Sequence, residues 1–167
     1  MVDFPMLMQP EHTHFMDRAL ALARQAMDEG NGPAGCVVVR DGEIVGEGRN
    51  LVQTNVDPTA HGETEAIRNA ATRLRTTDLA GATLYTTMEP CPMCCWAIIT
   101  ANIATVVLGA RHASFRRSDL GEYSVEALAA MTGRRLELIT GIREKECMDL
   151  RYDALALTVR QTRQKTT

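Results

Sequence analysis

Apolar residues recur with two different periods along the first half of the chain, and each change of period predicts a change of secondary structure. Between residues 14 and 30 apolar side chains return at helical spacing. Residues 34–50 contain two β-rich runs around an Asp-Gly pair, which is a strong hairpin signal. Helical spacing returns in residues 61–75. The pattern therefore predicts a helix, a β-hairpin and a second helix.

The second half of the chain continues the alternation with shorter apolar runs. Residues 82–88 and 104–110 read as buried strands, and the helix predicted between them has Pro92 where a first turn tolerates proline. A less patterned loop follows. Beyond it the sequence predicts a helix over 124–131, a strand over 134–140 and a final helix from about Glu144.

This order of elements is typical of an α/β protein. It predicts a three-layer α/β/α sandwich, in which helices cover both faces of a mixed sheet of mainly five strands. The chain has 167 residues, 45% of them apolar, which is enough for one core. Because no repeat or linker interrupts it, we expect a single domain over 1–167, with an N-terminal arm over 1–12 and a flexible basic tail over 158–167.

Composition and charge limit the kinds of binding partner and the cellular compartment that we expect for this protein. The net charge of −3 and the small number of aromatic residues, one Trp, three Tyr and three Phe, do not favour a polyanionic partner. No apolar run approaches the length of a membrane span, and the N-terminus lacks the pattern of a signal peptide, so we expect a cytoplasmic protein without a membrane partner. Five cysteines, an odd number, indicate metal binding or free thiols rather than a disulfide framework.

Three residues form a candidate zinc site. Cys91 and Cys94 are separated by two residues at a predicted helix N-terminus, where the helix dipole favours thiolates. His61 starts another predicted helix; alone, such a residue is more often a cap or a surface side chain. Together the three side chains match the catalytic pattern for zinc, in which three protein ligands leave a fourth position for water.

The other cysteines are assigned to the core. Cys95 could in principle close a four-ligand structural site, but on a helix it would point about 100° away from Cys94. Cys36, in a predicted strand, and Cys147, in the last helix, read as small buried hydrophobic residues. These assignments leave the zinc site open.

Glu63 lies two residues after His61 and is the candidate catalytic residue. A carboxylate is not needed as a fourth ligand, so it is free to take a proton from a zinc-activated water, whose pKa the metal lowers towards ~7. The alternative is a carboxylate that only complements the dipole of its helix.

The combination of the motifs HGE and PCPMC, at residues 61–63 and 90–94, is the signature of zinc deaminases. The chain resembles the cytidine deaminase-like superfamily from about Pro33 to Glu146. The resemblance implies a cytidine deaminase-like fold and the hydrolytic release of ammonia from an amino-substituted base. In that reaction Glu63 would carry protons first to a ring nitrogen and then to the leaving amine.

The resemblance also implies a substrate site. The region before His61 is similar to bacterial tRNA adenosine deaminases and yeast-type cytosine deaminases, whose Asn eleven residues before the ligand His holds the base; that residue is Asn50 here. Its amide could donate to a base carbonyl and accept from a ring N–H, although without the resemblance it would read as a turn residue. Gly62 and Phe115 complete the expected set. Phe115 could stack on a base, and it could equally be a core plug.

Two features favour a free base of the cytosine, isocytosine or guanine type over tRNA. The loop GARHASFRRSDLGEYS keeps only the first three residues of the loop GARDxKTGAAGS typical of tRNA enzymes, and the net charge is negative. A basic patch of Arg111, Arg116, Arg117 and the tail keeps a tRNA adenosine deaminase, which forms inosine, as an alternative.

A second alternative belongs to another class of protein. A non-catalytic, zinc-stabilised interaction protein would keep the three ligands but would not need Glu63 or Asn50. The resemblance also implies a homodimer, because related proteins often complete one another's pockets.

Overall fold

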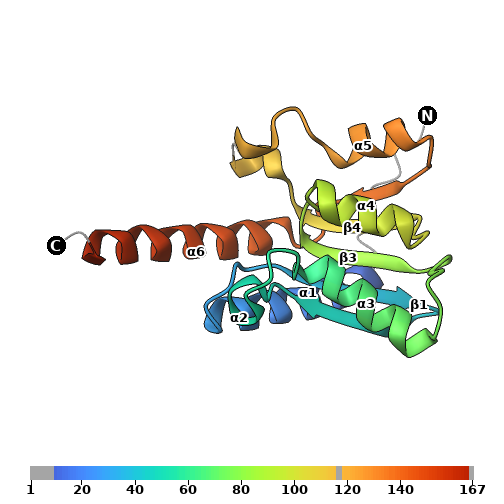
Figure 1. The fold of residues 1–167 in the computed structure, drawn as a ribbon, viewed down its shortest axis with the longest axis horizontal. Coiled ribbons are helices and arrows are strands. Elements are labelled where there is room, and N and C mark those ends of the chain that lie inside the picture. Colours follow the sequence, from blue (N-terminus) through green and yellow to red (C-terminus); the bar gives the residue numbers. More distant parts are fainter. Residues whose placement is uncertain (1–9, 116–117, 166–167) are drawn as a thin grey trace.

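A five-stranded mixed sheet forms the centre of the computed structural model, which describes residues 10–115 and 118–165 (Figure 1). The strand order is β2-β1-β3-β4-β5. The first three strands in this order pair antiparallel, and β3, β4 and β5 run parallel. The strands are β1 (Gly35–Arg40), β2 (Glu43–Arg49), β3 (Thr83–Met88), β4 (Thr105–Ala110) and β5 (Glu137–Thr140).

Helices cover both faces of this sheet, which confirms the predicted α/β/α sandwich. Helices α1 and α6 pack on one face, and α3 and α4 pack on the other, with α5 against α4. Short 3₁₀ turns at His112–Phe115 and Ser118–Leu120 lie between β4 and α5. The α-helices are α1 (Pro10–Asp28), α2 (Val52–Asn55), α3 (Gly62–Leu74), α4 (Pro92–Thr100), α5 (Val125–Thr132) and α6 (Glu144–Lys165).

The central strands are buried on both faces, so they read in sequence as continuous apolar runs. In β1, Val37 and Val39 join the core beneath α1 and α6, whereas Cys36 and Val38 join the core beneath α3 and α4. This is the period of two expected for a strand. Cys36 is thus a buried core residue, as predicted.

The two ends of the chain differ from the prediction. Helix α1 begins at Pro10, inside the expected arm, because proline suits a first helical turn and Glu11 complements the helix dipole there. Helix α6 continues to Lys165 through the expected tail, since residues 158–165 contain no Gly or Pro and are rich in Arg, Gln and Lys. Residues 1–9 and 166–167 lie outside the described chain. No helix in the described ranges is both long and apolar enough to cross a membrane.

Glycines on β2 let the backbone of α3 approach the sheet closely. A Cβ atom on Gly48 would lie 2.1 Å from the carbonyl oxygen of Gly62 and 2.4 Å from the amide nitrogen of Ala66. A Cβ atom on Gly46 would lie 2.3 Å from the carbonyl oxygen of Ala66. Because real side chains do not tolerate such distances, the absence of side chains at these positions sets the depth of α3 against β2.

Candidate active site

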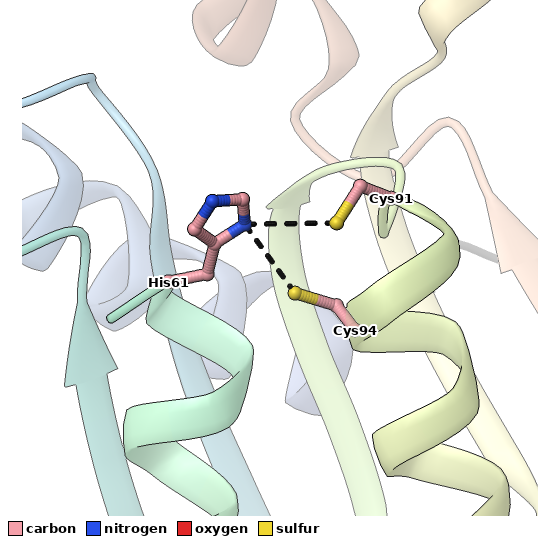
Figure 2. A group of neighbouring side chains, drawn as sticks. All are labelled: His61, Cys91 and Cys94. Carbon is pink, nitrogen blue, oxygen red and sulfur yellow. Dashed lines mark hydrogen bonds between the residues drawn. The ribbon is translucent and has the colours of Figure 1, made fainter. Parts of the chain in front are cut away.

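The N-termini of two neighbouring helices bring the three predicted zinc ligands together (Figure 2). His61 is the N-cap residue of α3, Cys91 is the N-cap residue of α4, and Cys94 lies buried in the first turn of α4. Nδ1 of His61 is 3.6 Å from Sγ of Cys91 and 3.5 Å from Sγ of Cys94. All three ligand atoms lie within 4.8 Å of one another.

These distances fit a tetrahedral zinc ion. Zn–S bonds of about 2.3 Å and Zn–N bonds of about 2.0–2.1 Å at tetrahedral angles require N···S separations of about 3.6 Å. The separations between His61 and the two cysteines match this value. Cys95 does not take part, because its side chain is fully buried against Ile99 and Val125. One coordination position therefore remains for water or substrate.

The thiols of Cys91 and Cys94 share one hydrogen bond. That bond from Cys94, assisted by another to His61, lowers the pKa of Cys91 to about 4, whereas the same bond and burial raise the pKa of Cys94. A thiolate at Cys91 is also favoured by the N-terminus of α4. Because a metal ion binds thiolates, zinc binding would displace the remaining proton.

Glu63, in the first turn of α3, is a buried carboxyl group beside the ligands. Its exposed fraction is 5%, and its Oε1 accepts a hydrogen bond of 3.2 Å from the Thr86 hydroxyl. Burial raises the pKa of Glu63, because desolvation disfavours the charged form. A carboxyl group whose pKa is shifted towards neutrality can accept and release a proton, which suits the predicted role.

A small pocket opens at this site. Its volume is about 120 Å³. A larger surface hollow of about 510 Å³ between β2 and α3 contains none of the ligands, so we place the chemistry in the smaller one. The pocket is lined by Gly32, Pro33, Ala34, Asn50, His61, Glu63, Met88, Glu89, Cys91, His112 and Arg151.

Asn50 lies in the pocket wall directly after β2, where the sequence placed it. Its Oδ1 accepts a hydrogen bond of 3.1 Å from the amide of Val52, and its Nδ2 lies on the side of Gly32. The residue therefore makes the turn contact that the sequence offered as an alternative, and it also lines the pocket. The bond to Val52 holds the amide in place and leaves Nδ2 as its donor.

Gly62 and Phe115 are not among the described residues that line the pocket. A Cβ atom on Gly62 would lie 3.3 Å from the carbonyl oxygen of Ala34, so this glycine packs α3 against the end of the hairpin. The Phe115 ring lies 5.1 Å from the ring of Tyr152 and packs against the core beneath α1 and α6. The 3₁₀ turn places His112, rather than Phe115, in the pocket wall. Of the two interpretations of Phe115, the structure therefore favours the one in which its side chain packs against the core.

Glu89, which sequence reasoning missed, connects three segments around the pocket. Its side chain is 3% exposed and accepts hydrogen bonds of 2.9 Å from the His112 amide and 3.3 Å from the Val125 amide. It also forms an ion pair of 3.2 Å with Arg111. The carboxylate thereby ties the end of β3 to the loop after β4 and to the start of α5. Its place directly before the PCPMC motif, at the end of a buried strand, was the available signal.

The predicted basic patch is in part neutralised. Arg111 contacts both Glu89 and Glu126, at 3.2 and 2.9 Å. Arg116 and Arg117 lie outside the described residues. Arg111, the first residue of the predicted patch, is therefore paired with carboxylates of the protein itself.

Residues 9–110 match the family described as the cytidine and deoxycytidylate deaminase zinc-binding region. The guanine deaminase of Bacillus subtilis (strain 168) is 46% identical over 102 residues, which cover 60% of this chain and 65% of that protein. The tRNA-specific adenosine deaminase of the same strain is 35% identical over 137 residues, covering 80% of this chain and 81% of that protein. The chloroplastic tRNA(adenine(34)) deaminase of Arabidopsis thaliana is 48% identical over 96 residues, but only 7% of its length is covered. The chain thus spans less than two thirds of the length of several relatives.

Solved structures agree with this match. A structure from a study of A-to-I editing by tRNA:A34 deaminases at the wobble position is 34% identical, with a TM-score of 0.74, over 83% of this chain and 99% of that one. The structure of guanine deaminase from Bacillus subtilis is 43% identical, with a TM-score of 0.61, over 65% of this chain and 70% of that one. The arrangement of sheet and helices is therefore shared with proteins of both kinds.

Proposed function

Because the chain belongs to the cytidine and deoxycytidylate deaminase zinc-binding family, we propose that it hydrolytically deaminates a free nucleobase of the cytosine, isocytosine or guanine type. The size and charge of the pocket carry this proposal. Its volume of about 120 Å³ is small beside the roughly 300–1,000 Å³ of sites for drug-sized ligands. Among its described lining residues, Arg151 is the one Lys or Arg, whereas a tRNA stem needs several cations for its phosphates.

The residues around the pocket have different roles in the proposed reaction. His61, Cys91 and Cys94 would hold zinc, which when bound supplies a Lewis acid and lowers the pKa of water. Glu63, held by Thr86, takes one proton from the attacking water and delivers it to a ring nitrogen. It then carries the remaining proton of the added hydroxyl to the amine, so that ammonia departs and a carbonyl remains on the ring. Asn50 donates from Nδ2 to the base and holds it in register with Glu63.

A tRNA adenosine deaminase forming inosine is the second candidate. It is favoured by the longer match to the tRNA-specific enzyme of Bacillus subtilis, which covers 80% of this chain against 60% for the guanine deaminase. It is disfavoured by the net charge of −3 and by the pairing of Arg111 with two carboxylates. A non-catalytic zinc-stabilised protein would leave the buried position of Glu63 without a purpose.

Ammonia release from a side-by-side panel tests the proposal. The panel contains cytosine, isocytosine, guanine, their nucleosides and an adenosine-bearing tRNA anticodon stem. We expect turnover of at least one free base, insensitive to moderate salt because no row of phosphate contacts is broken. Inosine formation in the stem without free-base turnover would refute the free-base proposal in favour of the second candidate.

We also propose a single deaminase domain over residues 1–167, a homodimer and a cytoplasmic location. Trp96 supports the homodimer, because its side chain is 54% exposed on α4, the helix that carries two zinc ligands. Sedimentation velocity of the zinc-loaded protein measures the oligomeric state.

A further inference from the structure

Cys91 lies where the chain leaves β3 and enters α4. Unlike Cys94, which is fully buried inside α4, Cys91 is the N-cap residue, has an extended backbone and is partly exposed. The amide of an N-cap residue has no partner within its own helix. The position of this ligand therefore depends on what holds the two residues before it, Glu89 and Pro90.

The backbone carbonyl of Pro90 accepts a hydrogen bond of 2.7 Å from the hydroxyl of Tyr123. This carbonyl belongs to the same planar peptide unit as the amide nitrogen of Cys91. Because proline has no N–H, the carbonyl is the one backbone group of Pro90 that a hydrogen bond can hold. The Tyr123 hydroxyl therefore fixes the plane from which the chain enters Cys91.

Tyr123 also contacts the other end of the ligand turn. Its side chain packs against the core cluster that contains Cys95, the residue after Cys94. Burial raises the pKa of Cys95, and the neighbouring Tyr123 hydroxyl acts in the opposite direction. Burial also raises the pKa of Tyr123, so its hydroxyl stays protonated at neutral pH and remains a donor. One side chain thus contacts the residue before Cys91 and the residue after Cys94.

The start of α5 holds Tyr123 in turn. Ser124, the next residue, caps α5, and its hydroxyl accepts a hydrogen bond of 3.1 Å from the Ala127 amide. The Val125 amide donates at 3.3 Å to the buried carboxylate of Glu89. A backbone amide and a side-chain hydroxyl from adjoining residues therefore join the start of α5 to the two residues that precede Cys91.

We propose that Tyr123 is a positioning residue for the zinc ligand Cys91 and acts through the carbonyl of Pro90. The inference goes beyond the proposed reaction and does not depend on which base is deaminated. Without the hydroxyl, the peptide plane before Cys91 is free to rotate, and its thiolate is held less well for tetrahedral coordination. Loss of a group that orients a metal ligand typically weakens metal binding by about 10- to 100-fold. Because Tyr123 acts from one residue away, we expect about 10-fold.

The test compares two tyrosine hydroxyls that each donate to a backbone carbonyl. Tyr123→Phe removes the hydroxyl and keeps the ring. Tyr152→Phe is the matched control, because the Tyr152 hydroxyl donates at 3.3 Å to the carbonyl of Ser114, which does not adjoin a zinc ligand. Each zinc-loaded protein is titrated with a zinc chelator of known affinity, which gives the dissociation constant of zinc. In a second measurement Co²⁺ replaces zinc, because its visible absorption depends on coordination geometry. Circular dichroism checks the fold of each variant.

We expect Tyr123→Phe to raise the dissociation constant of zinc by about 10-fold and to change the Co²⁺ spectrum. Tyr152→Phe should stay within about twofold of wild type, with the spectrum unchanged.

Two results would overturn the assignment of Tyr123. The first is a wild-type dissociation constant and Co²⁺ spectrum in Tyr123→Phe, even if its free energy of unfolding falls, because the hydroxyl would then serve only the stability of the fold. The second is an equal loss of zinc affinity in both variants, because the effect would not be specific to the segment before Cys91. Neither measurement uses a substrate, so failure of the free-base proposal would leave both results unchanged.

Discussion

The N-termini of α3 and α4 and the C-terminal helix α6 both border the candidate active site, but they are built in different ways. The zinc ligands lie at two helix N-termini packed on one face of the sheet, and His61 is 30 residues from Cys91 in the sequence. Helix α6 packs on the other face and contributes Arg151 to the pocket lining. The two parts pack on opposite faces of the sheet, so we expect that each can be disturbed without the other.

Removal of a zinc ligand should have the largest effect. Cys91→Ala or His61→Ala leaves only two of three ligands, so we expect zinc content to fall from about one ion per chain to near zero, with loss of activity. Elemental analysis after metal-replete expression measures this. Cys95→Ala is the matched control. Cys95 is buried in the core and is not a ligand, so this variant should bind zinc as the wild type does. Unchanged zinc in Cys91→Ala would contradict the site.

Glu63→Gln should separate proton transfer from metal binding at the candidate zinc site. The ligands remain, so zinc content and fold should match wild type, whereas turnover should fall by about 10²–10⁴-fold because an amide cannot accept and return the proton. Single-turnover assays on zinc-quantified protein provide the measurement. Activity near that of wild type would assign the acid–base role to another residue.

Glu89→Gln should have a smaller effect, which falls on the stability of the segments that Glu89 connects. An amide oxygen cannot satisfy the two amides and Arg111 together, so we expect a loss of about 1–3 kcal/mol in the free energy of unfolding. Glu126→Gln, which removes the exposed partner of the same arginine, should cost only about 0–1 kcal/mol. Urea denaturation of the zinc-loaded proteins compares the two. Equal losses in the free energy of unfolding would show that the burial of Glu89 contributes little to stability.

The periodicity of apolar residues was sufficient to predict the fold class. It did not predict those positions that depend on tertiary contacts. The central strands were found because burial on both faces makes them uniformly apolar. Strand β5 pairs only from Glu137, since its length is set by its neighbour β4 rather than by its own residues. The sequence left the place of the Phe115 side chain open, because its direction depends on a 3₁₀ turn and on Tyr152, which lies far along the chain.

The same distinction separates the predicted and the missed parts of the site. The ligands were predicted from the residue types and spacing of the HGE and PCPMC motifs, and the structure brings His61, Cys91 and Cys94 together. Glu63 was predicted from the first of these motifs. The place of Arg151 in the pocket lining could not be predicted in this way. Its sequence neighbours show only a helix, and its place in the pocket follows from how Cys147 and Leu150 seat that helix.

Gly48 shows that mutational intolerance need not identify chemistry. It lies on β2, with its backbone against the first turn of α3, and any side chain there would collide with the carbonyl oxygen of Gly62. The helix that would have to move carries Glu63 and follows His61. In a saturation scan read without a structure, Gly48 would therefore score like a metal ligand. Such a score would record the distance between two backbones, which no substituted side chain can preserve.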